Sequence, residues 1–485
     1  MENNRNHTDQ YWAFRKQYPE FIYKSYEVCE TEAELKVTYH FQITGLAEFA
    51  PTWRFPKPQA AEGVSVTEHV QAAGEVKTAG SGAAADGLLQ RMIFSLGMVE
   101  LVSYWKITCS PRVLVQAGTL DEKQIAWWKD LYFNGLGEFF YVNQIEGAEP
   151  ENFMEILADG PACPALGEAS AEASDTPVRV LVPIGGGKDS VVTLELLKEA
   201  GEDIYGYIIN PRGATVHTAE VAGLSADHVI SARRTLDKNM LELNQRGFLN
   251  GHTPFSAIVS FSALIAARLY HLPFIALSNE SSANESTVQG STVNHQYSKS
   301  FKYEQDFHNY AAEYLPGSSY YFSMLRPLSE FQIARYFAGC KAYHGIFRSC
   351  NVGSKADVWC GHCPKCLFVY LILSPFLERE AVQEIFGTDM LEDETMLGTL
   401  EQLVGIQEEK PFECVGSRDE INTAIMLTIR RMELAGEELP KLFVYYKTTG
   451  LYERYLEIGD LYSSSFDEEN LVPEKWKALV RNHYK

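Results

Sequence analysis

Hydrophobic and polar residues alternate along three segments near the beginning of the chain. The segments are residues 21–28, 34–43 and 48–56, and each is rich in aromatic and β-branched side chains. A period of two residues predicts strands that bury one face. Residues 60–87 are small and rich in Gly and Ala instead, which predicts a long loop exposed to solvent.

The spacing of apolar residues then changes to that of a helix. It predicts one helix over residues 88–106 and a second within residues 121–142. Together with the strands, these helices predict an α+β N-terminal domain over residues 1–146. Residues 147–177 are rich in Ala, Glu, Pro and Gly and hold few large apolar residues, which is typical of a linker or of a surface insertion.

After residue 177, strands and helices alternate. Residues 178–184 (VRVLVPI) are an unbroken apolar run, as expected for a strand buried on both faces. The pattern continues with a helix over 190–201, a strand over 203–211, a helix over 254–271 and a strand over 272–280. This order predicts an α/β fold with a parallel, doubly wound sheet over residues 178–375. Residues 376–485 are predicted to form a helical C-terminal region.

Composition and charge argue against two classes of partner, nucleic acids and membranes. The chain has 485 residues, with 42 Lys and Arg against 64 Asp and Glu, so its formal charge is −22. Nucleic-acid binders present a basic face, so we expect no nucleic-acid partner. The most apolar stretches, 255–267 and 366–377, are shorter than the ~18–20 residues that span a membrane. Because the N-terminus also lacks an apolar signal-peptide core, we expect a cytoplasmic protein without a membrane partner; its oligomeric state is not indicated.

A glycine-rich segment directly follows the strand at 178–184. Its six residues are Gly185, Gly186, Gly187, Lys188, Asp189 and Ser190. The glycines let backbone N–H groups approach a ligand closely, and the next helix directs its positive dipole end to the same place. The lysine adds a charge, the aspartate can hold Mg²⁺, and the serine can hydrogen-bond a phosphate. We predict a site for nucleotide phosphates; the simpler alternative is a turn without a ligand.

The order of residues in this segment distinguishes between phosphate-binding loops. Asp189 stands where a Walker A motif has Ser or Thr, and Ser190 stands where a dinucleotide fingerprint has Gly. The segment resembles instead the S-G-G-x-D-S loop of the ATP pyrophosphatases, which split ATP into AMP and pyrophosphate. Gly185 replaces the first Ser of that loop, which removes one hydroxyl contact to phosphate. The resemblance implies ATP and Mg²⁺ as ligands.

Four of the nine cysteines lie close together in the sequence. They are Cys350, Cys360, Cys363 and Cys366, with the spacing C-x9-C-x2-C-x2-C. Thiolates two residues apart on a tight turn can reach one tetrahedral ion, and four such ligands leave no open position for catalysis. The spacing predicts structural Zn²⁺. An iron–sulfur cluster uses the same ligands, and buried reduced cysteines are the remaining alternative.

Further motifs carry a narrower resemblance. They are PIGGGKDS (183–190), LNQRGFLNGH (243–252), SNESSANE (278–285), VNHQYSKS (293–300), LRPLSE (325–330), WCGHCPKC (359–366) and KPFECVG (410–416), with SYWK (103–106) and GLGEF (135–139) in the first region. In this order they resemble the UDP-N-acetylmuramoyl-L-alanyl-L-glutamate epimerases of bacterial cell-wall synthesis. The resemblance extends over about residues 20–425 and leaves out 60–87, 147–177 and the C-terminal end.

This resemblance implies an isomerase that inverts the terminal L-glutamate of a UDP-muramoyl dipeptide while ATP becomes AMP and diphosphate. An acyl-adenylate removes the carboxylate charge that opposes loss of the α-proton, so a modest base can take that proton. Five residues in polar motifs are candidates for catalysis: Asp189, Glu280, His295, His252 and Cys414. Each could instead have a purely structural role, such as capping a helix, pairing with a charge or, for Cys414, packing as a small apolar residue.

Five basic residues are candidate contacts for diphosphate and carboxylates, or else surface charges: Arg212, Arg233, Arg234, Lys299 and Arg326. The N-terminal domain is then a candidate for substrate recognition. Two other functions stay open. One is a different adenylating ligase or nucleobase-modifying enzyme of the ATP pyrophosphatase superfamily, and the other is a non-catalytic protein that binds ATP.

Overall fold

The computed structural model describes residues 6–58, 69–72, 86–162 and 178–483. Contacts between Cα atoms divide the chain into two compact units. Unit 1 comprises residues 1–175, 230–275 and 306–320, and unit 2 comprises residues 176–229, 276–305 and 321–485. The division is therefore discontinuous along the chain, whereas the sequence suggested consecutive segments with boundaries at 146, 177 and 375.

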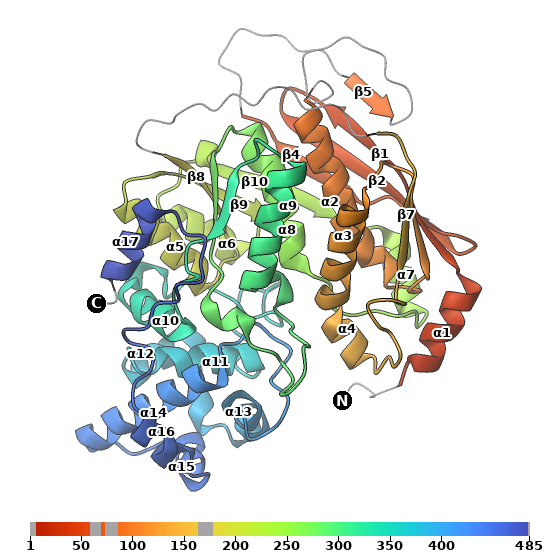
Figure 1. Cartoon of the computed structure of the whole chain (residues 1–485). Coiled ribbons are helices and arrows are strands. Elements are labelled where there is room, and N and C mark those ends of the chain that lie inside the picture. The colour runs from red at the N-terminus through yellow and green to blue at the C-terminus, as the bar shows by residue number, and fades with distance from the viewer. Residues whose placement is uncertain (1–5, 59–68, 73–85, 163–177, 484–485) are drawn as a thin grey trace. The chain divides into compact units, whose positions relative to one another are not determined.

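Unit 1 is built on a mixed β-sheet with the strand order β10-β4-β2-β1-β6-β7, to which β3 and β5 add at β2 and β1 (Figure 1). The strands are β1 (Glu20–Glu30), β2 (Glu34–Ile43), β3 (Ala47–Phe49), β4 (Thr52–Pro56), β5 (His69–Ala72), β6 (Arg112–Val115), β7 (Glu155–Ala158) and β10 (Val229–Thr235). β1 pairs antiparallel with β2 and parallel with β6. Every second residue of β2 is buried, which confirms the predicted alternation.

Three of the sequence expectations for this region need correction. Residues 69–72, inside the predicted loop 60–87, form β5 and pair with β1; the flanking residues lie outside the described ones. Residues 155–158, inside the predicted linker 147–177, form β7 and pair with β6. The single strand expected over 48–56 is two strands, β3 and β4, because the intervening Pro51 has no N–H to donate to a sheet.

A central helix, α2 (Gly87–Trp105), packs on the sheet of unit 1 (Figure 1). It is buried almost all round, and Asp86 caps its N-terminus by accepting from Leu88 and Leu89. A Cβ atom on Gly97 would lie 2.1 Å from the Tyr23 hydroxyl, so a glycine is required where the helix meets β1. The other helices of this unit are α1 (Thr8–Gln17), α3 (Glu122–Gly135), α4 (Gly137–Val142), α7 (Lys238–Gln245), α8 (Phe255–Leu269) and most of α9 (Phe301–Tyr314).

Unit 2 has the predicted strand–turn–helix–strand order at its start. β8 (Arg179–Pro183) leads through the glycine-rich segment into α5 (Lys188–Glu199) and then β9 (Asp203–Ile209), which pairs parallel with β8. The neighbours continue in the order β12-β11-β8-β9, with β11 (Phe274–Leu277) and β12 (Tyr320–Ser323). This is the α/β arrangement expected for the region, and the parallel pairing puts the carboxyl end of β8 beside that of β9.

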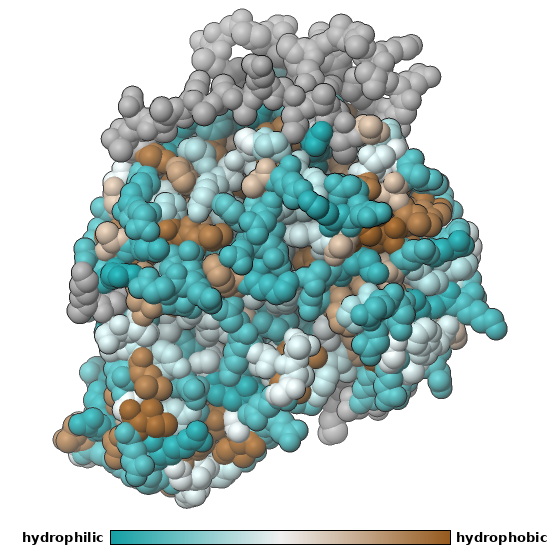
Figure 2. All heavy atoms as spheres, viewed as in Figure 1, coloured by the Kyte–Doolittle hydropathy of each residue, from teal (hydrophilic) through white to brown (hydrophobic). Residues whose placement is uncertain are grey.

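The C-terminal part of unit 2 is helical, as predicted. Its helices are α12 (Arg379–Phe386), α13 (Leu397–Val404), α14 (Arg418–Ala435), α15 (Lys441–Thr448), α16 (Leu451–Ile458) and α17 (Glu474–Asn482). The helices α6 (Gly213–Val221), α10 (Glu330–Gly339) and α11 (Pro364–Leu373) precede this part in unit 2. Residues 365–373 of α11 are all buried, and α14 packs against them. Figure 2 shows apolar side chains at the surface of the last helices, where Leu434, Val444 and Leu456 are exposed. In the described residues, no helix combines the length and apolarity needed to cross a membrane.

Candidate functional site

The glycine-rich segment forms a tight turn between β8 and α5. Gly186 has φ +81°, a left-handed conformation that favours glycine, and its carbonyl accepts from the Arg348 N–H at 2.7 Å. A Cβ atom on Gly186 would lie 2.9 Å from Ala214 Cβ, so the turn passes very close to the start of α6. Gly187 occupies the N-cap position of α5 with no side chain to satisfy the first N–H groups. The N-terminus of α5 thus has no side-chain cap, which is the backbone arrangement that an anion-binding turn requires.

Lys188 follows this turn and is surrounded by carboxylates. Its side chain is 3% exposed, and its ammonium donates to Asp189 and to Glu330. Burial alone would lower the pKa of Lys188, but the two carboxylates outweigh burial and raise it above its ordinary value. Lys188 is thus held as a cation. Ser190, by contrast, donates its hydroxyl to the Gly187 carbonyl at 3.0 Å, within the turn itself.

Three carboxylates meet beside this lysine. Oxygens of Asp189, Glu280 and Glu330 all lie within 4.8 Å of one another, and we call these residues the carboxylate cluster. Burial raises the pKa of Glu280 and of Glu330, whereas Lys188 and Lys365 overcome burial and lower that of Asp189. Oxygen ligands in such proximity suit a hard cation such as Mg²⁺.

Arg326 fixes the backbone on which the carboxylate cluster depends. It is fully buried and pairs with Glu304 at 2.9 Å. Its remaining N–H groups donate to the carbonyls of Glu280 and Lys299. The sequence suggested Arg326 as a contact for diphosphate or carboxylate ligands, but its guanidinium is engaged with protein groups and holds two site segments together.

Cys414 lies in an electropositive environment. The Lys299 ammonium is 3.2 Å from its Sγ, and His295 also hydrogen-bonds the thiol. Burial would raise the pKa of Cys414, but Lys299, His295 and Lys365 outweigh burial and lower it to about 5. The residue as a whole is partly buried, and its thiol lies among these positively charged side chains. Lys299 also interacts electrostatically with Glu280 and Asp189, which links Cys414 to the carboxylate cluster.

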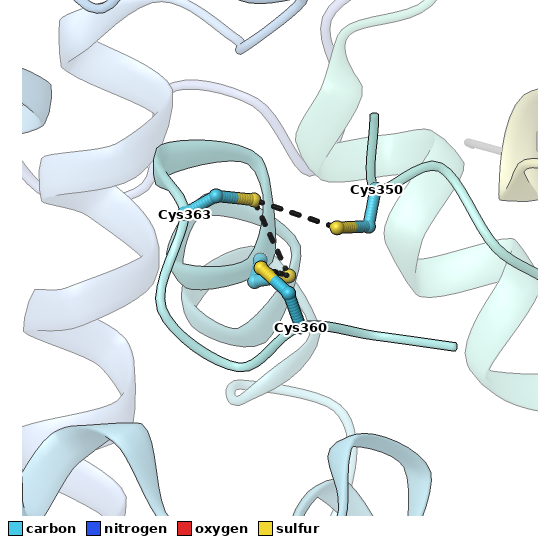
Figure 3. A group of neighbouring side chains, drawn as sticks. Cys350, Cys360 and Cys363 are labelled. Carbon is cyan, nitrogen blue, oxygen red and sulfur yellow. Dashed lines mark hydrogen bonds between the residues drawn. The ribbon is translucent and has the colours of Figure 1, made fainter. Parts of the chain in front are cut away.

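The four predicted metal ligands converge. The Sγ atoms of Cys350, Cys360, Cys363 and Cys366, which we call the cysteine cluster, all lie within 4.8 Å of one another. The Cys350–Cys363 and Cys360–Cys366 separations are 3.7 Å, and Cys363–Cys366 is 3.4 Å. Figure 3 labels Cys350, Cys360 and Cys363, whose thiols point toward one another near the start of α11. Sulfurs on a tetrahedron ~2.3 Å from a metal would be about 3.8 Å apart, so the donor set fits a single metal ion.

Helix α11 joins the cysteine cluster to Cys414. Cys363 is its N-cap residue and Cys366 lies in its first turn. Between them, Lys365 is 6% exposed and donates to the carbonyl of Cys414. A metal that fixes the two cysteines would therefore also fix the lysine that holds the backbone of residue 414.

The remaining predicted residues belong neither to the carboxylate cluster nor to the cysteine cluster. His252 belongs to unit 1, where its Nδ1 is 3.4 Å from the Glu138 carboxylate. Arg234 is also in unit 1 and forms a two-pronged ion pair with the buried Glu100. Arg212 is exposed and donates to Ser354 at 3.0 Å, and Arg233 is exposed as well.

Sequence reasoning missed Glu330 and Lys365. Both belong to motifs of the family resemblance, Glu330 to LRPLSE and Lys365 to WCGHCPKC. Their neighbours in these motifs, the helix-capping serine and the cysteines, have functions that the sequence itself suggests. Glu330 follows Ser329, which forms a capping box with Gln332 at the start of α10. That signal predicts a helix N-terminus, but it says nothing of Lys188, which is 142 residues away in the sequence.

Two family models match most of the chain. The model of the MurL N-terminal domain matches residues 13–324, and that of the MurL C-terminal domain matches residues 346–445. The chain therefore belongs to the MurL family. Curated relatives named UDP-N-acetyl-alpha-D-muramoyl-L-alanyl-L-glutamate epimerase are similar to most of its length.

Three such relatives illustrate the similarity. The protein of Xanthomonas oryzae pv. oryzae is 34% identical over 402 residues, which cover 81% of this chain and 86% of the relative. The protein of Micromonospora is 38% identical and that of Salinispora tropica 37% identical, each over 70% of this chain and 75% and 73% of the relative, respectively. No solved structure matched the chain.

Proposed function

We propose that this protein inverts the α-carbon of the terminal glutamate in UDP-N-acetylmuramoyl-L-alanyl-L-glutamate, and that it uses ATP to do so. The observation that carries the proposal is membership of the MurL family over both domains, since the named relatives are epimerases of this dipeptide. The product would serve peptidoglycan precursor synthesis. The use of ATP rests on the geometry of the phosphate loop.

The phosphate loop is suited to convert ATP into AMP and diphosphate, as in the ATP pyrophosphatases. Free N–H groups at the start of α5 would bind phosphate oxygens, and Lys188 would neutralise part of their charge. Asp189 and Glu330, two members of the carboxylate cluster, would hold Mg²⁺, which supplies further charge neutralisation. Attack of the substrate carboxylate on the α-phosphorus then gives an acyl-adenylate and releases diphosphate.

Adenylation makes the proton transfer feasible. A free carboxylate would place two negative charges on adjacent atoms once the α-proton leaves, and the acyl-adenylate removes one of them. Among the candidate bases, Cys414 is the best suited, because Lys299 and His295 would hold it as a thiolate near neutral pH. Glu280 has a raised pKa and can act as the acid that returns a proton. Hydrolysis of the adenylate releases the product and makes the cycle directional.

The other candidates take supporting roles in this proposal. His295 hydrogen-bonds Cys414 and would stabilise the thiolate rather than meet the substrate. His252, paired with Glu138 in unit 1, stays a candidate for the second proton transfer. The cysteine cluster would hold Zn²⁺ as a structural ion, because an iron–sulfur cluster distributes its thiolates over two or more irons and would keep at least some of the sulfurs farther apart.

The first experiment measures diphosphate release from ATP and Mg²⁺ with and without the UDP-muramoyl dipeptide. We expect release only when the dipeptide is present. Release that depends on another acceptor would favour a different adenylating enzyme of the superfamily. Absence of release with any acceptor would favour a protein that binds ATP without turnover. In Asp189→Ala, release should be lost while the circular dichroism spectrum stays that of the wild type.

The second experiment follows the α-proton in D₂O. The D-glutamyl product should carry deuterium at its α-carbon, and no exchange should occur without ATP or with an analogue blocked at the α–β bridge. Cys414→Ser should lower the rate of exchange by at least about 100-fold, because a serine hydroxyl is not ionised near neutral pH. Cys340→Ser is a matched control, since burial raises the pKa of that thiol to about 11. Full exchange in Cys414→Ser would remove Cys414 from the mechanism.

The third experiment addresses the metal. Elemental analysis of protein that has never met a chelator should find about one zinc per chain. Removal of the metal should increase hydrogen exchange around residues 345–373 and slow epimerisation more than it weakens ATP binding, because Lys365 connects the cysteine cluster to Cys414. Protein free of both zinc and iron would contradict the assignment.

A further inference from the structure

Lys106 is a buried cation with little to neutralise it. The residue is the C-cap of α2 in unit 1 and is 7% exposed. Its ammonium donates to the carbonyl of Gly251, a neutral acceptor. An ammonium has three N–H groups, and among the residues that the structure describes no carboxylate forms an ion pair with Lys106.

The charged groups around Lys106 do not provide the missing anion. Arg234 is close enough to repel the ammonium, and the Glu100 carboxylate pairs with Arg234 at 2.7 Å. The Glu138 carboxylate pairs with His252 at 3.4 Å and attracts Lys106 only weakly. Burial and Arg234 together lower the pKa of Lys106 to about 8.

The segment that faces Lys106 is held rigidly. Asn143 donates to the carbonyl of Asn250 at 3.1 Å. A Cβ atom on Gly251 would lie 3.0 Å from the Phe139 ring, and one on Gly135 would lie 2.8 Å from Pro254. Residues 250–254 are therefore fitted closely against α3 and α4, and Lys106 is part of a built polar site rather than a flexible surface side chain.

Burial of a charge without a counter-charge is unfavourable, and charged groups in such surroundings are concentrated at functional sites. We propose that Lys106 forms an anion-binding site in unit 1 that receives an oxyanion of the nucleotide-sugar peptide, either its diphosphate or a peptide carboxylate. The inference rests on the proposed function for the identity of the substrate. It assigns to unit 1 a part in substrate binding that is independent of the ATP loop of unit 2.

Protection of Lys106 from a small amine-acylating reagent tests the site in the wild-type protein. Peptide mass spectrometry at pH 8 measures the acylation of Lys106 in the protein without a probe and in the presence of each probe. The UDP-muramoyl dipeptide should reduce acylation at least about fivefold. Protection by UDP-N-acetylglucosamine, which has a diphosphate and no carboxylate, would identify the diphosphate as the source. Protection by free L-Ala-L-Glu would identify a carboxylate. The proposal would be overturned if only ATP protected Lys106, or if none of the probes protected it.

Calorimetric binding supplies a second measurement. Lys106→Met should weaken binding of the UDP-muramoyl dipeptide at least about tenfold and leave ATP binding unchanged. Lys123→Met is the control, because Lys123 is an exposed lysine of the same unit. Wild-type protein that does not bind the dipeptide at all would contradict the proposed function. Wild-type and Lys106→Met proteins that bind it equally well would refute only the anion site.

Discussion

Lys188 in unit 2 and Lys106 in unit 1 are buried to a similar degree, with 3% and 7% exposed surface, but their surroundings are opposite. Lys188 donates to two carboxylates, which raise its pKa, whereas Lys106 donates to a backbone carbonyl and faces an arginine, which helps to lower its pKa. Burial depth alone therefore says little about a charged residue. The neighbours decide whether the charge is part of the folded framework or is available to a ligand.

The largest expected difference between the two lysines is in stability. Lys188→Met leaves Asp189 and Glu330 without their cation, so it should destabilise the protein by about 3–5 kcal/mol and stop ATP turnover. Lys106→Met removes an unneutralised charge and one hydrogen bond, two effects that oppose each other, so the free energy of unfolding should stay the same or rise by up to about 2 kcal/mol. Urea denaturation at pH 7 measures both. Equal losses in the two variants would contradict the comparison.

A second prediction concerns pH. The pKa of Lys106 is about 8 in the folded protein and 10.5 in the reference state, so between these values the unfolded chain binds more protons. Stability contributed by this residue therefore rises with pH across that window, by at most about 3 kcal/mol. Denaturation curves from pH 7 to 10 should show this rise in the wild type and not in Lys106→Met. The neighbours Arg234, Glu138 and Cys109 are the same in both proteins, so their effects largely cancel.

A smaller effect is expected when one of the two carboxylates around Lys188 becomes neutral. Glu330→Gln keeps an oxygen that can accept from Lys188 but loses the charge. It also relieves repulsion from Asp189 and Glu280, so the net loss should be about 1–2 kcal/mol. Thermal denaturation compares this variant with the wild type. A loss as large as that of Lys188→Met would mean that Glu330 alone neutralises the lysine.

The smallest effect belongs to an exposed pair. Lys123 and Glu313 are 3.4 Å apart, with 80% and 55% of their side chains exposed. Solvent screens such pairs, so Lys123→Ala should change stability by less than about 0.5 kcal/mol. The measurement is urea denaturation at low and high salt. A loss comparable to that of a buried pair would show that exposure does not separate these lysines.

The sequence predicted local structure well and long-range charge contacts poorly. The alternating and helical patterns located β1, β2, α2, β8, α5 and β9 within a few residues. The sequence did not predict β5. This strand has four residues within a Gly- and Ala-rich segment, and it is defined by its pairing with β1 rather than by its own pattern. The cysteine spacing identified four residues that do converge, since a short turn brings most of them together.

The candidate site depends on contacts that no local pattern contains. Glu330 meets Lys188 across 142 residues, and Lys299 meets Cys414 across 115. The sequence could list Cys414 as a candidate, but its lowered pKa follows from Lys299 and Lys365, which only the fold brings near. The sequence suggests Arg326 as a ligand contact because a guanidinium binds anions well. In the structure Arg326 is buried and forms an ion pair with Glu304 instead.

The position of Arg326 bears on any attempt to transplant this chemistry into another scaffold. One guanidinium carried by the segment after β12 sets the backbone of Glu280 and of Lys299, so the three pieces have to be moved as a set. A motif transferred alone would lack the guanidinium that fixes its backbone. Lysine is no substitute, because a single ammonium lacks the planar fork that reaches two carbonyls and Glu304 at the same time. A designer would therefore graft the arginine first and the reactive residues afterwards.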